Sequence, residues 1–338
     1  MAKFLIIRFS SIGDIVLTTP VIRCLKKQVK DAEVHFLVKE SFRSLIEHNP
    51  YLDKLHVLTD NWNTMINELL KEDFDFIIDL HHNLRTLIVK RKLKKRSFSF
   101  NKLNMEKFIF TSLKVNILPK IHIVDRYLKT AESFGVKNDG EGLDFFIGEH
   151  NQVQINEIPD LHHKGFIACI IGAGHSTKKL PVHKWKEFCQ KINQPIILLG
   201  GKEDIEQGNT IATVDPVNVF NGCGKFSINQ SADIIRKANV VVSNDTGFMH
   251  IAAAFKKPII SLWGNTVPAF GMYPYYGESY IKQQAISPFD ILETKKLWCR
   301  PCSKIGYAKC PLGHFKCMEK IPVDLMISSV IKREIKFP

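Results

Sequence analysis

The sequence predicts an α/β protein with two domains, each built on a parallel sheet. Short apolar runs alternate along the chain with segments whose apolar residues recur at helical spacing. This alternation is typical of parallel strands joined by helical crossovers. The same unit of strand, small-residue turn and helix occurs in both halves of the chain. A length of 338 residues also suits two domains.

In the first half, Pro20 falls inside a helical pattern, so it should kink this helix or mark where its regular part begins. Helices are also expected at 42–46, 62–70 and 121–134. We interpret the polar stretch 148–160 as the connection between two domains, and we expect the boundary between domains 1–160 and 161–338 near Asp160. Five short apolar runs are the expected strands of this half, at 4–9, 34–38, 54–58, 74–79 and 97–100.

The second half repeats the pattern. Helices are expected from Pro181, which suits a helix start, after Asp204, from Phe248 and at 321–331. The expected strands of this half are at 165–171, 195–199, 240–242 and 259–263, and the stretches 217–220 and 226–238 lead into the unit that contains the last two.

The turn formed by Asp245, Thr246 and Gly247 follows one of these strands and begins the next helix. Backbone N–H groups at a helix N-terminus lack intrahelical acceptors, so an anion can bind there. Gly247 has no side chain, so a phosphate could approach its backbone closely. Ordinary helix capping by Asp245 or Thr246 explains the same residues without a ligand.

A second turn rich in glycine and hydroxyl groups covers residues 172–179, GAGHSTKK. It fits neither the Walker A pattern nor G-x-G-x-x-G. It can still hold a diphosphate, because Ser176 and Thr177 can donate hydrogen bonds and Lys178 or Lys179 can neutralise charge. A surface turn with solvated lysines is the alternative.

Acidic residues also follow predicted strands. Asp14 begins a helix just after the run 4–9, and Glu203 and Asp204 follow the run 195–199. Open α/β sheets bind ligands at this edge, and an acid there can accept hydrogen bonds from ribose hydroxyls. The alternative in each case is an anion stabilised by a helix dipole, worth about 0.3–1 kcal/mol.

The polar cluster 79–86 ends another strand and includes His81, His82 and Arg85. Adjacent histidines do not share a face, so a metal pair is disfavoured and a substrate-contacting loop is expected. Cys299, Cys302, Cys310 and Cys317, with His314 between the last two, fit either a zinc site or reduced buried thiols.

The net formal charge of +13 indicates an acidic partner. The densest cationic run, KRKLKKR at 90–96, is either a solvated helix end or a patch for anionic lipid headgroups or a phosphorylated acceptor. No nucleic-acid-binding motif is present, so a nucleic-acid partner is not expected. The chain has no apolar run of membrane-spanning length and no signal-peptide pattern at its start, so we expect a cytoplasmic protein.

Three segments resemble one family, the ADP-heptose:lipopolysaccharide heptosyltransferases of glycosyltransferase family 9. They are SSIGDIVLTTPVIRCLKK at 10–27, GAGHSTKKLP at 172–181 and VVSNDTGFMHIAAAFKKPIISLWG at 241–264, and the cysteine-rich segment 299–317 is also similar. The resemblance implies the GT-B fold, in which two Rossmann-like domains with parallel sheets face each other across a cleft. The domain 1–160 would bind the acceptor and 161–338 the nucleotide sugar.

The resemblance also implies roles for individual residues. Asp14 corresponds to the general base, and Lys178, or Lys179 one position on, to the phosphate-binding lysine. Leu180 departs from the tryptophan found in many members, which bears on the identity of the donor sugar. The remaining donor residues are Ser176, Thr177, Glu203 at the ribose, Phe226 near the adenine, Asp245, Thr246, Gly247 and His250. The acceptor residues are Arg8, Ser10, Ser11 and Gly13, to which the polar loop adds Arg85.

We therefore expect an inverting, metal-independent glycosyltransferase without a cofactor. Its donor would be a nucleotide sugar such as ADP-heptose, and its acceptor a lipid-linked glycan at an anionic membrane surface. An epimerase or hydrolase of nucleotide sugars is the alternative among enzymes, and it would release free product. A non-catalytic binding module linked by zinc at the four cysteines is the alternative from another class.

Overall fold

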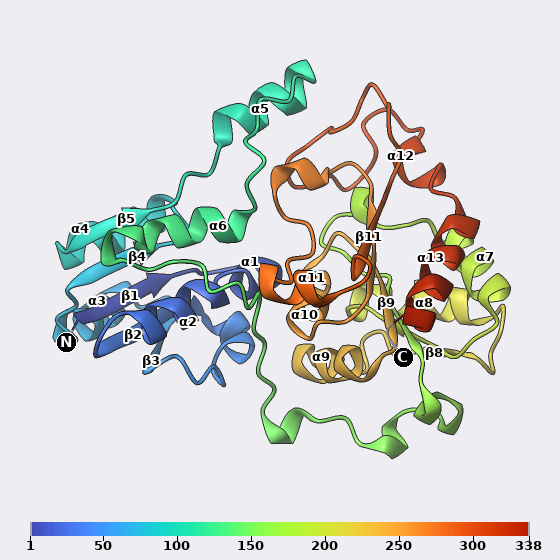
Figure 1. The fold of residues 1–338 in the computed structure, drawn as a ribbon, viewed down its shortest axis with the longest axis horizontal. Coiled ribbons are helices and arrows are strands. Elements are labelled where there is room, and N and C mark those ends of the chain that lie inside the picture. The colour runs from blue at the N-terminus through green and yellow to red at the C-terminus, as the bar shows by residue number, and fades with distance from the viewer. Residues whose placement is uncertain (1, 337–338) are drawn as a thin grey trace. The chain divides into compact units, whose positions relative to one another are not determined.

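The computed structural model describes residues 2–336, which form two compact units (Figure 1). The first unit contains the described residues up to Lys102, together with Ile121–Phe146 and Gly277–Tyr280. The second contains Leu103–Lys120, Ile147–Tyr276 and the described residues from Ile281 onward. The domain boundary expected near Asp160, and the acceptor and donor roles of the two domains, stay predictions.

The first unit is built on a five-stranded parallel sheet with the order β3-β2-β1-β4-β5. Phe4, Leu5, Ile6 and Ile7 are consecutive and all buried, as expected for a central strand covered on both faces. The strands are β1 (Ala2–Ile7), β2 (Ala32–Lys39), β3 (Lys54–Leu58), β4 (Phe76–Asp79) and β5 (Arg96–Ser99).

Helices connect these strands. Pro20 lies in the first turn of α2, so it marks where the regular helix begins rather than kinking it. The helix expected at 121–134 is divided into an α-helix and a 3₁₀ helix, and the one expected at 42–46 is also 3₁₀. The helices are α1 (Ile12–Val16), α2 (Thr19–Gln28), η1 (Glu40–Leu45), α3 (Trp62–Lys71), α4 (Leu84–Leu93), α6 (Ile123–Leu128) and η2 (Lys129–Phe134).

The second unit is built on a six-stranded parallel sheet with the order β11-β10-β9-β6-β7-β8. Trp185 packs in a core cluster of this unit with Phe188, Val242 and Met326. The strands are β6 (Ile167–Ile170), β7 (Ile196–Leu199), β8 (Val219–Asn221), β9 (Val240–Asn244), β10 (Ile259–Trp263) and β11 (Phe289–Glu293).

Figure 1 shows α7 (Val182–Ile192), α8 (Ile205–Ala212) and α13 (Val323–Lys336) on one side of this sheet. On the other side lie α9 (Ile228–Lys237) and α10 (Gly247–Ala254). The other helices are α5 (Asn104–Leu113), η3 (Glu149–Asn151), η4 (Ile155–Glu157), η5 (Asp160–Lys164), η6 (Ser176–Lys178), η7 (Lys202–Asp204), η8 (Pro268–Phe270), α11 (Glu278–Gln283) and α12 (Lys316–Glu319).

Each sheet has one point at which the strand order reverses. In the first unit β1 lies between β2 and β4, and in the second β6 lies between β7 and β9. The crossovers from β1 and β4, and from β6 and β9, therefore leave in opposite directions. Ligands of open α/β sheets bind beyond the carboxyl ends of such strands, so these two edges are where a site is expected.

The helix α5 and the strand β11 were not predicted from the sequence. The stretch expected to be a polar connection contains only short 3₁₀ turns, namely η3, η4 and η5. Within residues 2–336, no helix combines the length and the apolar character needed to cross a membrane.

Candidate functional site

The carboxyl end of β1 carries the predicted base and its neighbours. Ser11 precedes α1, a single short helix, and Asp14 lies in its first turn. The backbone N and the Oγ of Ser11 donate to Asp14 Oδ2 at 3.4 and 3.0 Å. Gly13 lies between them and is buried. The turn after β1 therefore holds the Asp14 carboxylate at the sheet edge.

Arg8 fixes the same carboxylate from the strand side. One guanidinium nitrogen of Arg8 lies 2.6 Å from Asp14 Oδ2, and its Nε donates to the carbonyl of Ser10 at 2.6 Å. Another nitrogen donates to the hydroxyl of Tyr127 at 3.1 Å and to the carbonyl of Leu80. Because Arg8 is buried and all three of its guanidinium nitrogens have partners within the first unit, its charge acts mainly on Asp14.

The Asp14 carboxylate is ionised at neutral pH. Burial alone would raise its pKa, but the charge of Arg8 and the hydrogen bonds from Ser11 outweigh this effect and hold the pKa below its usual value. The side chain still keeps 20% of its exposure. All recorded contacts of the carboxylate go to Oδ2, so Oδ1 is the oxygen without a partner among the described residues.

At this edge the sequence-based prediction missed Tyr127 and included His81 only as part of the polar loop 79–86. Tyr127 is buried and contacts Arg8, and His81 packs its ring against Phe9 with 5.0 Å between ring centroids. Burial and the charge of Arg8 lower the pKa of His81 to about 4, so its ring is neutral. Its Nδ1 has no hydrogen-bond partner among residues 2–336. The pair His81-His82 after a predicted strand was the available signal for this residue.

The polar loop after β4 is held by Asp79. The backbone N–H groups of His81 and His82 donate to Asp79 Oδ1 at 3.1 and 2.7 Å, and Lys90 Nζ lies 2.8 Å from its Oδ2. Lys90, the first residue of the cationic run, is therefore an internal partner of a buried acid. Arg85 is exposed on the first turn of α4, and the structure gives it no contact with Asp14.

In the second unit, the turns after β6 and β9 come together through an ion pair. Lys178 Nζ lies 2.7 Å from Asp245 Oδ2, which also accepts from Thr266 Oγ1 at 2.7 Å. Asn244, at the end of β9, donates to the carbonyls of Ile170 and Ile171. The two predicted phosphate-binding segments are therefore adjacent at the carboxyl edge of neighbouring strands.

Lys179 points to a different partner from Lys178. Its Nζ lies 2.5 Å from Asp204 Oδ1, and Asp204 is fully buried. A Cβ on Gly172 would lie only 2.5 Å from the Asp204 carboxylate, so this glycine makes room for the pair. Thr177 is occupied too, because its hydroxyl exchanges hydrogen bonds with the backbone of Tyr307 at 3.1 and 2.8 Å. Both residues therefore have structural partners.

The helix α10 begins at Gly247, and Thr246 is its N-cap without a side-chain capping bond. Thr246, Gly247 and Phe248 keep part of their surface exposed, whereas His250 is buried one turn further along. The first N–H groups of this helix lack intrahelical acceptors. Lys178 lies beside this N-terminus, where its ammonium group pairs with Asp245, so the dipole of α10 and an exchangeable cation are available at the same place.

The other predicted donor residues line the same edge of the sheet. Ser176 is exposed before Lys178, and Glu203 is exposed beside the buried Asp204. Phe226 is half-buried after β8, where its ring packs over Gly222, whose missing Cβ would lie 3.2 Å from the ring. These side chains are available to a ligand but do not contact Lys178.

Within residues 2–336, the cysteine-rich segment supplies no group of three potential ligand atoms that all lie within 4.8 Å of one another. The Cys299 Sγ lies 3.8 Å from His314 Nε2, and the Cys302 thiol donates to the carbonyl of Cys299 at 3.0 Å. Burial raises the pKa of the Cys302 and Cys317 thiols to about 11. In the described part of the chain, the one convergent group of potential metal ligands is formed elsewhere, by residues of β2, β3 and α3. The zinc interpretation of the segment gains no support from this geometry.

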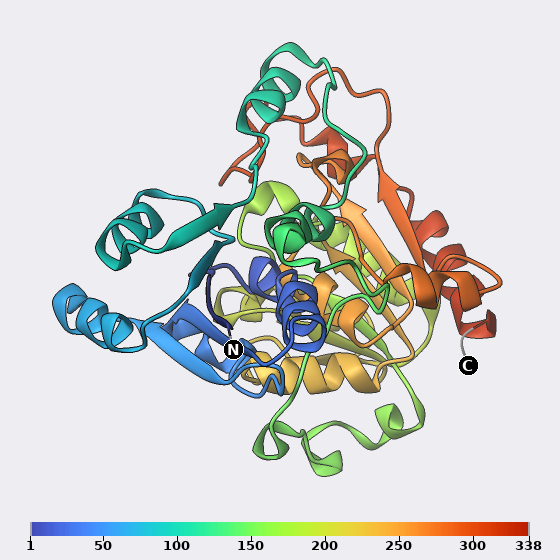
Figure 2. The same ribbon diagram turned by 60° about the vertical axis from the view of Figure 1, so that its left-hand side comes forward.

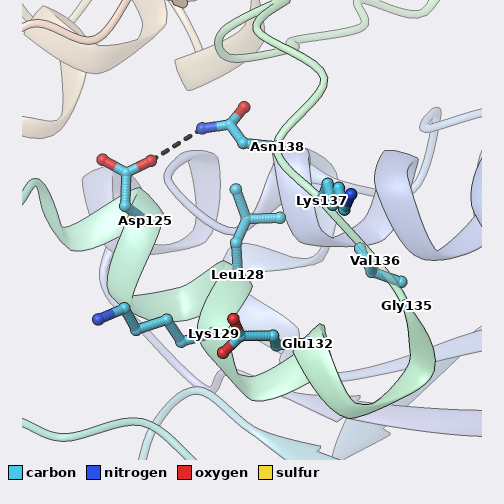
Figure 3. Close-up of a pocket in the computed structure, with 8 residues that line it drawn as sticks. All are labelled: Asp125, Leu128, Lys129, Glu132, Gly135, Val136, Lys137 and Asn138. Carbon is cyan, nitrogen blue, oxygen red and sulfur yellow. Dashed lines mark hydrogen bonds between the residues drawn. The ribbon is translucent and has the colours of Figure 1, made fainter.

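A surface hollow of about 280 Å³ lies along α6 and the turn that follows it (Figure 3). Figure 3 shows Asn138 reaching across to Asp125, with 2.8 Å between Nδ2 and Oδ1. None of the predicted catalytic, donor or acceptor residues lines it. The chemistry is therefore assigned from the charged clusters at the sheet edges.

Comparison with known proteins identifies relatives over most of the chain. The family described as glycosyltransferase family 9 (heptosyltransferase) matches residues 62–292. Lipopolysaccharide heptosyltransferase 1 of Campylobacter coli is 27% identical over 294 residues, which cover 78% of this chain and 84% of that protein. Lipooligosaccharide heptosyltransferase 2 of Campylobacter jejuni is 23% identical over 336 residues, which cover 94% of this chain and 93% of that protein.

Solved structures agree on the fold. A glycosyltransferase of family 9 from Veillonella parvula superposes with a TM-score of 0.76 at 22% identity, covering 99% of this chain and 97% of its own. The ADP-heptose lipopolysaccharide heptosyltransferase II of Escherichia coli gives a TM-score of 0.73 at 16% identity and covers 98% of both chains. The predicted α/β class, a GT-B fold with two Rossmann-like domains on parallel sheets, is confirmed.

Proposed function

The chain belongs to glycosyltransferase family 9, and from this premise we propose that it transfers a heptose, or a related sugar, from an ADP-sugar to a lipopolysaccharide core or similar glycan. The names of the relatives support this donor and this acceptor. The observation that carries the proposal is a pair of charged clusters, Arg8 with Asp14 and Lys178 with Asp245, each at the edge where its sheet reverses order.

Asp14 is the proposed general base. Its Oδ1 takes the proton of the acceptor hydroxyl while the acceptor oxygen forms a bond to the anomeric carbon. The bond from that carbon to the diphosphate oxygen breaks at the same time, which inverts the configuration. General base catalysis of this kind contributes about 10²–10⁴-fold. Arg8 and Ser11 hold Oδ2 and so keep the carboxylate ionised and oriented.

The leaving nucleoside diphosphate gains negative charge as this bond breaks. Lys178 and the N–H groups of Thr246 and Gly247 are the groups proposed to stabilise it. A preorganised ammonium group and a helix N-terminus can supply this charge without a metal. Turnover measured as ADP release should therefore continue in excess EDTA. Loss of turnover in EDTA, restored by Mg²⁺, would show that these cations are insufficient.

The remaining site residues are assigned to the acceptor or the donor according to the domain in which they lie. In the acceptor domain, residues 1–160, Arg8, Ser10, Ser11, Gly13 and Arg85 border the acceptor site. In the nucleotide-sugar domain, residues 161–338, Ser176, Thr177, Lys179, Glu203, Phe226, Asp245 and His250 border the donor. The bond of Thr177 to Tyr307 and the pair of Lys179 with fully buried Asp204 support a structural role for these two residues. Lys178 is paired instead with Asp245 beside the N-terminus of α10, and this position favours it as the phosphate ligand.

We also propose a cytoplasmic protein in peripheral contact with an anionic membrane, because its acceptor is lipid-linked. The net charge of +13 supports this, as do Arg91, Lys92 and Lys94, which are exposed on the cationic run. Product analysis tests the reaction itself. Sugar attached to the acceptor is expected, whereas free sugar released at the same rate without acceptor would indicate the epimerase or hydrolase alternative.

A further inference from the structure

The segment Leu103–Lys120 leaves the first unit after β5 and packs with the second unit instead. Its helix, α5, has no buried residue. A helix of ten residues is marginal in water by itself, so it needs a surface against which to pack. The question is what covers the side of α5 that the protein leaves open.

One face of α5 is attached to the second unit. Phe110 meets Phe270 edge to face, with 5.9 Å between centroids, and Lys107 lies 6.0 Å from the same ring. Lys114 Nζ donates to the carbonyl of Pro301 at 2.8 Å. These contacts fix the orientation of the helix and decide which side chains point away.

The opposite face is apolar and open. Met105, Phe108 and Leu113 are exposed by 75%, 66% and 69%. Their spacing of three and then five residues places them near one side of the helix. Val115 and Ile117, just after the helix, are also more than half exposed. Scattered exposed apolar residues are ordinary, but a row of large ones on one helix marks an interaction surface.

A second exposed apolar group comes from residues 294–316, which lie beside α5 (Figures 1 and 2). Lys304 Nζ is 3.5 Å from Asn104 Oδ1, and Lys114 reaches Pro301, so the two segments are in contact. Trp298 is 74% exposed and Ile305 57%. We call α5 with this segment the α5 surface.

The charge of the α5 surface is strongly positive. Residues 294–316 contain Arg300 and five lysines and no acidic residue, and 103–120 contain three lysines and one glutamate. Lys295, Lys296, Lys304 and Lys309 are exposed. A second copy of this chain would bring like charges together at this surface, whereas anionic headgroups would neutralise them.

We propose that the α5 surface docks on an anionic lipid surface, with Met105, Phe108, Leu113 and Trp298 inserted at the boundary between headgroups and acyl chains. Apolar side chains ringed by lysines are the arrangement expected of an interfacial helix, and tryptophan favours this depth. The inference rests on the proposed function in one respect, since a lipid-linked acceptor places the reaction at a membrane. It adds which part of the chain makes the contact.

The test compares vesicle co-sedimentation of three full-length proteins on phosphatidylcholine vesicles, with and without phosphatidylglycerol. The variant M105S/F108S/L113S should bind anionic vesicles about tenfold more weakly than the unchanged protein. The matched control L70S/I155S/V217S removes three other exposed apolar side chains and should bind as the unchanged protein does. Equal binding by M105S/F108S/L113S and the unchanged protein would overturn the proposal.

Trp298 supplies a second readout. The chain has four tryptophans, and Trp185 and Trp263 are buried in the core of the second unit. Anionic vesicles should shift the emission to shorter wavelength, and the shift should disappear in Trp298→Phe. An unchanged spectrum in the presence of bound vesicles would contradict insertion of this side chain.

Further arms separate this inference from the proposed function. If R91S/K92S/K94S loses binding while M105S/F108S/L113S keeps it, the membrane contact stands but the α5 surface is not its site. If the unchanged protein is a dimer, whereas M105S/F108S/L113S is a monomer that binds vesicles as before, the α5 surface is a dimer interface between two copies of this chain and not a membrane contact. All variants should transfer sugar to a water-soluble, deacylated acceptor at the same rate. If the unchanged protein shows no such transfer, the result contradicts the proposed reaction and not the role of the α5 surface.

Discussion

At the scale of the residue, Arg8 and Asp14 show how one ion pair can leave a carboxylate both ionised and reactive. The closest contact of Arg8 and both hydrogen bonds from Ser11 involve Oδ2, and no hydrogen bond to Oδ1 is found among the described residues. The Asp14 carboxylate can therefore accept a proton on Oδ1 without first breaking a hydrogen bond when the substrate binds. The same contacts lower its pKa, which makes it a weaker base that stays ionised into acid.

Asp14→Asn should therefore lower kcat by about 10²–10⁴-fold, because the amide cannot accept the proton. The fold should survive, since an amide can still accept from Arg8 and Ser11 through its oxygen. Steady-state kinetics with donor and acceptor measures the effect, and Asp60→Asn, an exposed acid on the same unit, is the control. Turnover within a few-fold of the unchanged protein would remove Asp14 from this role.

Substitution of Lys179 should mainly lower stability, whereas substitution of Lys178 should mainly lower activity. Among the described residues, Lys179→Ala leaves the fully buried Asp204 with no cation and only the hydrogen bond from the Gly201 backbone N–H, and should lower the free energy of unfolding by about 3 kcal/mol. Lys178→Ala leaves Asp245 bonded to Thr266 and should lower kcat/KM for the donor by about 10²-fold with little loss of stability. Urea unfolding and donor kinetics on both variants test this, and the reverse pattern would assign the phosphates to Lys179.

At the scale of the element, the pairing of β2 with β3 carries a buried histidine pair. His35 Nδ1 and His56 Nε2 lie 2.9 Å apart, and the other nitrogen of His35 is 2.7 Å from Glu33. Glu72, the third member of this convergent group, is bound by Lys54. The nitrogens and the carboxylate are therefore occupied by one another and by lysine, which is why no metal is assigned to them.

The histidine pair should make stability depend on pH. Burial and the charge of His35 lower the pKa of His56 from 6.5 to about 4, so between these values the unfolded chain binds more protons. Stability is then fully present above about pH 6.5 and falls as the pH drops toward 4, by up to about 3 kcal/mol from His56. The pKa values of His35 and His81 are also lowered, so they add in the same direction.

Denaturant unfolding at pH 7 and pH 5 measures this effect. His56→Gln keeps a donor for His35 but cannot titrate, so its stability should change less between the two pH values. His183→Gln, which alters a histidine that is 65% exposed, should retain the full dependence. If all three proteins lose the same stability, the pair is not the source of the effect.

Elements with strong internal patterns were predictable from the sequence, whereas those defined by their partners were not. The strand β11 is a short segment with Asp290 near its start, and its parallel pairing with β10 is what makes it a strand. The helix α5 lacks the buried face that sequence patterns detect. Asp14 and the turn at Asp245 were predictable because each follows an apolar run. Tyr127 was not, because 119 residues separate it from Arg8.

At the scale of the whole molecule, the two units should respond differently to a nucleotide. The groups proposed to bind the diphosphate, Lys178 and the N-terminus of α10, lie in the second unit, as do the buried Trp185 and Trp263. Tryptophan fluorescence therefore follows mainly the unfolding of the unit that would hold the donor. A ligand that binds only the folded state stabilises it by mass action.

ADP at 100 times its dissociation constant contributes about 2.7 kcal/mol, which corresponds to about 5–10 °C in the unfolding temperature of a unit of this size. We expect this shift with EDTA present, because the cations that meet the diphosphate belong to the chain. Lys178→Ala should lose most of the shift at the same ADP concentration, while Asp14→Asn should keep it, because the base is not needed to hold the nucleotide. A shift that Lys178→Ala retains in full would place the diphosphate elsewhere in the molecule, and the charged cluster after β6 and β9 would then have no part in the reaction.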